Sequence, residues 1–473
     1  MEKTELIVIG AGPGGIQAAI TASELGLEVT LIDSQPSAGG QYFMQQPREF
    51  NNHDTGYHQK QASELLQKLV NSNVKFLDKS LVWGIFHNPK TNLWQLTLQG
   101  DRCPSRIEAP SVVIATGAYD RSIPFPGWDL PGVMTAGAAQ IMIKNQAVLP
   151  GKKVIVTGTG PLQLAAASNL IEAGAKVSAV LECNQNLIFR GLPHLPSIWG
   201  QWRRLKEGVE YAGNLIRAKT PYRIGWSVSK AEGFEKVEVV TIGKLDSEGY
   251  PIPTSYQNIA VDAIVVGYGL TPSTEFFRLL DVEMFYSKSE GIFLPKRNDF
   301  FQTSAPGIYA VGDCAGIGGA NLAMLEGKIA AIDVAVQTGQ TRLSTMNATL
   351  KQSIKHLKCE QKFARMLGEI FALPEGLFSL ARPDTIICRC EQTSLAEVKQ
   401  AISYGAQSVT DIKNITRSGM GNCQGRTCGS ILTQLLARDI RWNPEDCQYL
   451  NIRPPVHPIM VEIIKEETYE VLP

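Results

Sequence analysis

The chain has 473 residues, 44% of them hydrophobic, which is enough for about three domains with large cores and unlike a disordered protein. Lysine plus arginine and aspartate plus glutamate each total 45, and this zero balance argues against nucleic acid or an anionic membrane as a partner. The first apolar run, Leu6–Ile9, is too short for a signal peptide, and no stretch approaches the roughly 18 apolar residues that span a bilayer. We therefore expect a cytoplasmic protein without a transmembrane segment.

The N-terminal sequence predicts a strand, a glycine-rich turn, a helix and a second strand. The first strand, Leu6–Ile9, is followed by the turn, the helix reaches Leu25, and the second strand ends before Asp33. In such a turn, one glycine allows the tight bend, one lets the backbone approach a pyrophosphate, and one allows the helix to pack on the strand. An acid after the second strand accepts hydrogen bonds from ribose hydroxyls. These features predict a dinucleotide site at Gly10, Gly12, Pro13, Gly14, Gly15 and Asp33.

The same pattern returns later in the chain and makes an internal repeat. A strand from Lys153 leads to Gly158 and Gly160, and a helix and a second strand lead to Glu182. The interval from first glycine to acid is 23 residues in the first copy and 24 in the second. Gln163 replaces the third glycine, so we expect its side chain to crowd the contact between helix and strand. Two interpretations remain open. The second copy either binds a nucleotide through Gly158, Gly160 and Glu182, or it is a scaffold domain that keeps the fold without binding one.

Each copy also has a later apolar strand, and a Pro- and Gly-rich stretch from Pro124 to Gly132 indicates a domain crossing. Together these patterns predict an α/β protein with two Rossmann-like dinucleotide-binding domains and a small C-terminal domain. The expected parts are a discontinuous first domain, a second nucleotide-binding domain, a helical linker, a small domain and a proline-containing tail, at residues 1–125 with 271–336, 126–270, 337–379, 380–440 and 441–473. The tail, with Pro454 and Pro455, is expected either to lie against another surface or to be solvated.

Four of the nine cysteines form two tight pairs near the C-terminus. Cys388 and Cys390 are followed, after 32 intervening residues, by Cys423 and Cys428. An odd number of cysteines clustered late in a large chain is not typical of a disulfide framework, and four thiolates in two pairs can hold a metal. The spacing and the surrounding residues, with Gly419-Met420-Gly421 before the second pair, resemble the bacterioferritin-associated-ferredoxin-like 2Fe–2S domain. The resemblance implies a 2Fe–2S cluster on Cys388, Cys390, Cys423 and Cys428; structural zinc is the alternative.

Several segments of the first 335 residues resemble the two-dinucleotide-domain flavoproteins, which include the pyridine nucleotide–disulfide oxidoreductases. The matching residues are Gly39-Gly40-Gln41, Ala115-Thr116-Gly117, Gly312-Asp313 and Ala323…Glu326-Gly327. The resemblance implies non-covalent FAD in the first domain, with Gly40, Gln41, Thr116, Gly117, Gly312 and Asp313 among its contacts. The loop after Gly40 has no cysteine, and the second domain has no C-x-x-C pair, so dithiol chemistry is not expected.

The order of the domains, and the stretch from Ala115 to Val133, are similar to the alpha subunits of heteromeric amino-acid and opine dehydrogenases. In that family an oxidase-like FAD beta subunit oxidises a C–N bond, and the alpha subunit handles the electrons. The resemblance does not identify the electron acceptor. It also leaves open whether there is an additional small partner chain, and whether the protein associates peripherally with the membrane through its acceptor. The segment from Trp199 to Arg204 and the tail are candidate contact surfaces. No catalytic acid/base pair is recognisable, because the six histidines are isolated in the sequence. A stand-alone NAD(P)H-dependent reductase and a non-enzymatic iron–sulfur module are the alternatives, and the second fold is open to NAD(P) or ATP.

Overall fold

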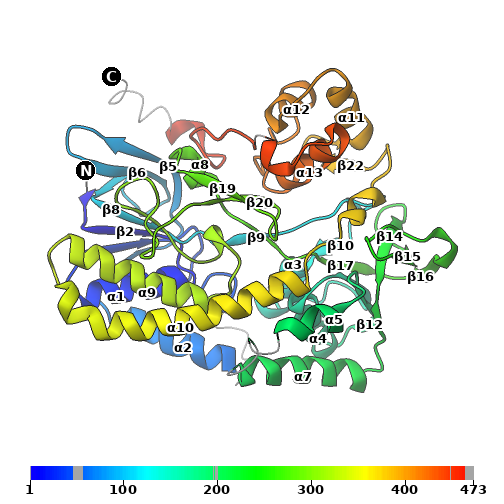
Figure 1. Cartoon of the computed structure of the whole chain (residues 1–473), viewed down its shortest axis with the longest axis horizontal. Coiled ribbons are helices and arrows are strands. Elements are labelled where there is room, and N and C mark those ends of the chain that lie inside the picture. The colour runs from blue at the N-terminus through cyan, green and yellow to red at the C-terminus, as the bar shows by residue number, and fades with distance from the viewer. Residues whose placement is uncertain (1, 46–56, 195–196, 198–200, 448, 464–473) are drawn as a thin grey trace.

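The computed structural model of the chain describes residues 2–45, 57–194, 197, 201–447 and 449–463. Two bodies built on parallel sheets lie side by side, and a small helical unit from the C-terminal part of the chain lies against them on one side (Figure 1). Within the described residues, no helix is both long enough and apolar enough to cross a membrane.

The first body contains a parallel sheet of five strands, in the order β21-β8-β2-β3-β4. Each strand is short and its interior positions are apolar, as expected for a sheet covered on both faces. The helices α1, α2 and α9 cover one face, and α1 packs closely along α9. A second sheet, β1-β7-β6-β5, lies on the other side. The bounds are β2 Leu6–Ile9, α1 Pro13–Glu24, β3 Val29–Ile32, α2 Tyr57–Val70, β4 Lys75–Leu77, β8 Ser111–Ile114, β21 Ile308–Ala310 and α9 Ala320–Gln337, with β1 Glu2–Lys3, β5 Leu81–Asn88, β6 Leu93–Gln99 and β7 Arg106–Ala109.

The second body repeats this plan, with a parallel sheet in the order β10-β17-β11-β12-β13. Strands β11 and β12 stand where β2 and β3 stand in the first body, which confirms the predicted repeat. Helices α3, α4 and α7 pack on one face, and an antiparallel sheet, β14-β15-β16, lies beside the other. The bounds are β10 Val133–Thr135, α3 Ala136–Lys144, β11 Lys153–Gly158, α4 Pro161–Glu172, β12 Lys176–Glu182, α5 Leu187–Gly191, α7 Trp202–Arg217, β13 Tyr222–Ile224, β14 Trp226–Glu232, β15 Val239–Lys244, β16 Gln257–Ala260 and β17 Ala263–Gly267.

Two antiparallel strands carry the chain between the bodies. Strand β9, Ala118–Asp120, runs outward and pairs with β18, Leu270–Pro272, which runs back. The returning chain forms α8, Glu275–Leu279, and the hairpin of β19, Met284–Ser287, with β20, Ile292–Pro295. The crossing therefore lies at the boundary between the two sheets, where side chains from both bodies meet.

The helix α10, Leu343–Ile370, is 28 residues long and connects the two bodies. It contacts α9 in the first body and α5 in the second, and it runs along the lower side of the molecule in Figure 1. Its six buried residues are spaced along one side of the helix and include Leu350, Leu357 and Phe363. The next segment, a 3-10 turn at Glu375–Leu380, inserts Leu377 into the core of the second body.

The C-terminal unit begins with β22, Ile386–Cys388, and β23, Thr393–Ser394, and continues with three helices, α11 Leu395–Ser403, α12 Val409–Thr416 and α13 Cys428–Ile440. Capping boxes start the first two of these helices, at Ser394 with Glu397 and at Ser408 with Asp411. The unit has a core of its own. The chain then returns to the first body, where Val456 is buried and its N–H donates to the carbonyl of Trp83 at 2.9 Å.

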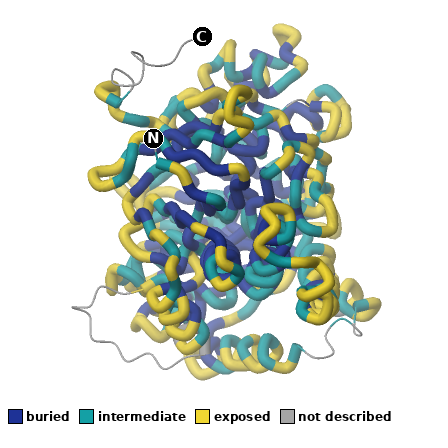
Figure 2. The backbone as a smooth tube through the Cα atoms, turned by 90° about the vertical axis from the view of Figure 1, so that its left-hand side faces the viewer, coloured by how far each residue is buried: buried dark blue, intermediate teal, exposed yellow. Residues whose placement is uncertain are grey.

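The described part of the tail therefore lies against a surface, which is one of the two arrangements expected from the sequence. This surface belongs to the same chain. Residues 448 and 464–473 of the expected tail lie outside the described residues. Figure 2 shows the burial pattern: buried backbone fills the interior, and exposed residues gather on the peripheral helices and loops. The boundaries predicted at 126, 271, 337, 380 and 441 stay predictions.

Candidate cofactor sites

The first glycine-rich turn has three glycines with three different surroundings. A Cβ on Gly15 would lie 1.9 Å from the carbonyl oxygen of Gly10, and a Cβ on Gly10, whose φ is +100°, would lie 2.4 Å from that of Ala115. A Cβ on Gly12 would have no atom within 4 Å. Gly10 and Gly15 thus allow backbone packing, whereas Gly12 borders open space at the N-terminus of α1. An exposed helix N-terminus beside such space suits a phosphate.

Asp33 stands at the end of β3, beside this turn. Its Oδ2 accepts the N–H of Ala11 at 2.6 Å and its Oδ1 accepts the N–H of Gln35 at 2.8 Å. Burial raises the pKa of the Asp33 carboxyl, and the two backbone hydrogen bonds lower it in part. The carboxylate therefore braces the turn while it borders the same cavity as Gly12.

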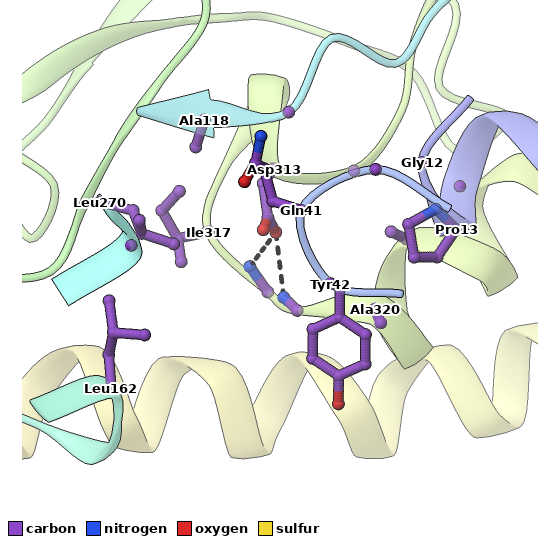
Figure 3. Close-up of a pocket in the computed structure, with 18 of the residues that line it drawn as sticks. Gly12, Pro13, Gln41, Tyr42, Ala118, Leu162, Leu270, Asp313, Ile317 and Ala320 are labelled. Atoms are coloured by element: carbon purple, nitrogen blue, oxygen red, sulfur yellow. Dashed lines mark hydrogen bonds between the residues drawn. The ribbon is translucent and has the colours of Figure 1, made fainter. Parts of the chain in front are cut away.

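The Gly312-Asp313 pair is held by its neighbours in a similar way. The Oδ1 of Asp313 accepts the N–H groups of Gly318 and Gly319 at 2.9 and 3.0 Å (Figure 3), and burial raises the pKa of its carboxyl. The N–H of Gly312 donates to Oε2 of Glu326 at 2.7 Å. Glu326, 1% exposed, forms a two-point ion pair with Arg297 at 2.8 and 2.9 Å. The buried Glu326 of α9, paired with Arg297 from the chain between β20 and β21, thus fixes the turn that presents Asp313.

The loop with Gly39 and Gly40 closes over the first turn. Both glycines have positive φ, +129° and +60°, and a Cβ on Gly40 would lie 2.9 Å from Cα of Gly12. Gln41 and Tyr42 follow and project toward the cavity, Tyr42 in the direction of α10 (Figure 3). On the opposite wall, Gly117 has a φ of +72° and nothing within 4 Å of its Cβ position.

These elements surround one continuous cavity of about 2100 Å³ between the two bodies. Its lining contains every residue predicted for the first site except Gly15, which is buried beneath the turn: Gly10, Gly12, Pro13, Gly14, Asp33, Gly40, Gln41, Thr116, Gly117, Gly312 and Asp313. The cavity also reaches the second body at Leu162 (Figure 3). The open space at Gly12 and Gly117 and the polar walls at Asp33 and Asp313 fit an extended dinucleotide such as FAD.

The second glycine-rich turn has a different environment. A Cβ on Gly160 would lie 3.5 Å from Cβ of Phe371, the residue that follows α10, and the carbonyl of Phe371 accepts the hydroxyl of Thr159 at 3.5 Å. Phe371 therefore partly covers the backbone that a pyrophosphate would approach, while Thr159 and Gly160 still border the cavity. Gly158 bends the chain against β17, since a Cβ there would lie 2.0 Å from the carbonyl oxygen of Gly267.

Glu182 is fully buried beneath this turn, and its carboxylate is engaged by the protein. Its Oε2 accepts from the side chain of Gln163 at 2.7 Å, from the N–H of Gly160 at 3.1 Å and from the hydroxyl of Tyr222 at 3.3 Å. Burial raises the pKa of the Glu182 carboxyl. Ribose binding by Glu182 stays a prediction, and this arrangement disfavours it.

The expected crowding by Gln163 is relieved in the structure. Its Cβ faces Gly267, which has no side chain, so α4 still packs on the sheet. The Gln163 side chain turns inward to Glu182 instead of separating the helix from the strand.

The four predicted cysteines lie together in the C-terminal unit, as two facing pairs. Cys428 hydrogen-bonds to Cys388, which lowers the pKa of Cys388 to about 5 and raises that of Cys428. Cys390 lies beside Cys423, and burial together with this neighbour raises the pKa of Cys390. The backbone N–H of Gly419 points at the Cys388 sulfur, and a Cβ on Gly421 would lie 2.4 Å from Cβ of Cys390. The glycines before the second pair thus provide an N–H donor and room for close approach.

Among the described residues, no three His, Cys, Asp or Glu side chains converge as closely as a single ion requires. Four cysteine thiols in one small unit are the ligand set of a 2Fe–2S cluster, and Cys388, Cys390, Cys423 and Cys428 would hold it. Cys388 and Cys428 are buried and Cys390 is exposed, so one pair lies deeper than the other.

Sequence reasoning missed His457, which lines the cavity. Burial, together with the neighbouring Arg426, lowers the pKa of His457 to about 4, so the ring is neutral near pH 7. No local signal marks this residue, because its neighbours Phe276 and Arg426 are distant in sequence. Of the segment from Trp199 to Arg204, Trp199 lies outside the described residues, whereas Trp202 is exposed and Arg204 pairs with Glu360 at 2.7 Å.

Comparison with known proteins agrees with this architecture. Residues 4–339 match the family described as pyridine nucleotide-disulphide oxidoreductase. The chain belongs to this family. Residues 386–438 match the BFD-like [2Fe-2S] binding domain, which contains all four predicted cysteines.

Relatives match along nearly the whole chain. An opine oxidase subunit of Agrobacterium tumefaciens (strain Ach5) is 30% identical over 96% of this chain and 90% of its own. Hydrogen cyanide synthase subunit HcnB of Pseudomonas protegens is 30% identical over 98% of both chains. The chain thus belongs with these oxidoreductase subunits, as the resemblance of its motifs implied.

A solved structure shows the same fold. L-proline dehydrogenase from P. horikoshii aligns with a TM-score of 0.72 at 22% identity, over 98% of this chain and 80% of that one. The expected fold class, two Rossmann-like domains with a C-terminal 2Fe–2S domain, is confirmed.

Proposed function

We propose that this chain is an electron-transfer subunit that binds FAD and a 2Fe–2S cluster and works within a heteromeric dehydrogenase or oxidase. Its substrate class is the C–N bond of an opine, a proline-type compound or a small amino acid. When bound, FAD takes up electrons in pairs and a 2Fe–2S cluster carries them singly. The observation that supports this proposal is the joining of one dinucleotide cavity to a four-thiol unit in a single chain, at a contact between Tyr119 of the cavity wall and Arg426 of the cysteine loop.

The residues that would hold FAD are those of the first site. The N-terminus of α1, beside Gly12, would meet the pyrophosphate, Asp33 would meet the adenosine ribose, and Asp313 the ribityl chain. The flavin ring of FAD would be bordered by Gly40, Gln41, Thr116 and Gly117. Residues from the second body, such as Leu162, border this end of the cavity (Figure 3).

A stand-alone NAD(P)H-dependent reductase is the main competing function. Phe371 covers Gly160 and the Glu182 carboxylate is engaged inside the domain, and both features argue against a reducing nucleotide there. We therefore propose that the second body is a scaffold that closes the FAD cavity, and occupancy by an adenine nucleotide would contradict this role.

The partner that we propose is an oxidase-like FAD subunit, because relatives over the full length are named as subunits of an opine oxidase and a hydrogen cyanide synthase. The helix α7 offers a surface for it. The side of α7 that faces the chain carries Arg204, which pairs with Glu360, and Asn214, which bonds to Ser168, beside the buried Leu215. The exposed side of the helix carries apolar residues. We call this outward side the α7 stripe; it consists of Trp202, Leu205, Val209 and Ile216, exposed by 66%, 40%, 72% and 76%.

A protein partner suits the α7 stripe better than a membrane surface does. Helices that lie on membranes present a basic polar face to the headgroups. Here the polar face is occupied by intramolecular contacts, and the exposed flanks carry both signs of charge, at Lys206 and Glu210. An exposed apolar patch of this kind is typical of a protein–protein interface.

The cofactor assignment is tested on anaerobically purified protein. We expect about two irons for each chain, a reducible signal in electron paramagnetic resonance, and FAD released by heat. Serine at any of the four cluster cysteines should remove the signal, whereas Cys359→Ser, at an exposed site, should keep it. Stoichiometric zinc without iron, or FMN in place of FAD, would contradict the proposal.

The proposed role within a heteromeric complex is tested by co-expression with the oxidase-like partner. The complex should dehydrogenate an opine, a proline-type compound or a small amino acid and pass the electrons to an artificial dye, and Cys390→Ser should lower dye reduction while leaving the complex assembled. Turnover of such a substrate by the isolated chain at the rate of the complex would show that this role is wrong.

A further inference from the structure

Arg426 lies between the second pair of cysteines and its side chain is buried, 9% exposed. It is the fourth residue of the loop Cys423–Cys428. Its guanidinium reaches out of the C-terminal unit and ends at the wall of the FAD cavity. A charged group is buried at such a junction only where the surrounding structure satisfies it.

Three parts of the chain satisfy Arg426. Its Nη1 donates to the carbonyl oxygen of Cys423 at 3.2 Å, which fixes the cysteine loop from within. Its Nε donates to the hydroxyl of Tyr119 at 2.9 Å, on β9 of the cavity wall. Its Nη2 donates to the carbonyl oxygen of Val456 at 2.8 Å, in the returning tail. One guanidinium thus ties the cysteine loop, the cavity wall and the tail together.

The cavity side of this contact is itself fixed. Glu275 Oε1 lies 3.5 Å from Nε of Arg426 and supplies the opposite charge. Ser273 donates to the other oxygen of Glu275 at 2.8 Å and approaches the Tyr119 hydroxyl at 3.3 Å. Tyr119, Ser273, Glu275 and His457 all line the cavity. The groups that receive Arg426 are therefore the same groups that face the space proposed for the flavin.

A second contact between the units has a different character. The indole N–H of Trp128 donates to the carbonyl of Ile386 at 2.6 Å, and Arg389 stacks over the Trp128 ring at 5.2 Å. Trp128 is buried and is absent from the cavity lining. This contact anchors the first cysteine pair to the domain crossing, whereas Arg426 connects the second pair to the cavity.

We propose that Arg426 is a positioning residue that holds the Cys423–Cys428 loop against the flavin cavity and thereby sets the rate of electron transfer between flavin and cluster. The inference rests on the proposed function. An arginine suits this place because its planar guanidinium directs several N–H donors along fixed directions, here to Cys423, Tyr119 and Val456. A lysine would keep the charge but has one nitrogen at the end of a flexible stem, so it would make only some of these three hydrogen bonds.

The test uses the full chain with both cofactors bound. Flavin is reduced by a light flash with an external photoreductant, and the rate at which the cluster is reduced afterwards is followed by its absorbance. The variants are Arg426→Gln, Arg426→Lys and Tyr119→Phe. Arg417→Gln is the matched control, because Arg417 lies in the same unit and pairs with Glu391 at 3.1 Å on its exposed side.

In Arg426→Gln the rate of flavin-to-cluster transfer should fall at least about tenfold, the change expected in a docking equilibrium from losing one hydrogen bond to a charged group. Flavin content, iron content and the cluster's paramagnetic signal should be retained. Arg426→Lys should restore part of the rate, and Tyr119→Phe should lower it without altering the cysteine loop. Arg417→Gln should transfer electrons as the unaltered chain does.

Should Arg426→Gln lose its cluster, Tyr119→Phe decides the question, because it changes the contact from the cavity side. Unchanged transfer in Tyr119→Phe together with unchanged transfer in any Arg426 variant that retains the cluster would overturn the inference alone. Absence of flavin-to-cluster transfer in the unaltered chain would contradict the proposed function itself, and the two failures are thus distinguishable.

Discussion

Gly12 and Gly15 belong to one turn, yet a side chain at each would meet different surroundings. The backbone of Gly12 has a φ of −76°, which any residue adopts, and the space beside it is open. At Gly15 a Cβ would collide with a backbone oxygen. A substitution at Gly12 therefore affects what the cavity can hold, and one at Gly15 affects the packing of α1 on its strand.

We expect Gly12→Val to fold but to lose FAD, because its side chain fills the space proposed for the pyrophosphate. Gly15→Ala should lower the melting temperature and the yield of folded protein. Gly213→Ala is the control, since this glycine of α7 is not one of the residues that line the cavity and has only the end of Arg217 nearby. FAD content after heat release and the melting temperature are measured; FAD retained in Gly12→Val would show that the site is wrongly placed.

His457 gives the tail a predictable response to pH. Its pKa is lowered from 6.5 to about 4 in the folded chain, so the fold favours the neutral ring. Between these two values the unfolded chain binds a proton that the folded chain does not, so the free energy of unfolding rises as the pH rises from about 4 to about 6.5. The contribution of His457 to the free energy of unfolding is complete above about pH 6.5 and is lost as the pH falls toward about 4.

We expect the melting temperature of the unaltered chain to fall more steeply from pH 7 to pH 5 than that of His457→Gln, whose side chain stays neutral. The protection factors of the amides in residues 449–457, corrected for the intrinsic pH dependence of exchange, should fall over the same range. His87→Gln serves as control, because His87 is exposed on β5. Parallel pH profiles for the unaltered chain and His457→Gln would contradict the assignment.

At the scale of elements, α10 decides what the second nucleotide fold can do. It carries Phe371 from the first body to Gly160, and the Glu182 carboxylate below is already bonded to Gln163. We expect NADH to reduce the bound FAD far more slowly than tens per second, the range of ordinary turnover. Phe371→Ala should bind NADH more tightly, by roughly tenfold or ~1.4 kcal/mol, because it uncovers the turn.

The measurements are stopped-flow reduction by NADH and calorimetric titration with NADH. Phe189→Ala is the control, because Phe189 lies on α5 in the same body and is exposed. Rapid reduction of the FAD in the unaltered chain by NADH would support a stand-alone reductase and contradict the proposed role as an electron-transfer subunit.

The elements that the sequence predicted are those specified by local patterns. The two glycine-rich turns follow from residues close together in the chain, and the cysteine pairs from a spacing that one small unit brings together. The contact over Gly160 is made by Phe371, which is 211 positions away in the sequence. The contact between the C-terminal unit and the cavity wall joins Tyr119 to Arg426, which are 307 positions apart. Such pairs have no periodicity or motif. Glu182 is a similar case. Its position in the sequence predicts ribose binding, but in the folded chain its carboxylate accepts hydrogen bonds from Gln163 and Tyr222, which local sequence patterns do not reveal.

At the scale of the whole molecule, the chain is built so that its last unit closes on its first. The C-terminal unit contacts the crossing through Trp128 and the cavity wall through Arg426, and the tail buries Val456 in the core of the first body. Helix α7 lies on the opposite side of the molecule from the C-terminal unit (Figure 1), and the residues of the α7 stripe are exposed there. The proposed partner surface and the cysteine unit therefore lie apart, and of the α7 stripe only Leu205 borders the cavity proposed for FAD.

This separation leads to a test of assembly. Val209→Glu places a carboxylate in the middle of the α7 stripe, and burying it unpaired against the oxidase-like partner would weaken the complex by at least about tenfold. The chain itself should keep FAD, the cluster and its melting temperature, because Val209 is exposed in the isolated chain. Phe234→Glu is the matched control, since Phe234 is a 92% exposed apolar residue in the same body, away from α7. Affinity is measured by titration of the two purified proteins, and dye reduction by the mixture should fall in parallel with it. A Val209→Glu chain that binds the partner as tightly as the unaltered chain would place the interface elsewhere, and one that loses FAD or iron would show that the α7 stripe supports the fold.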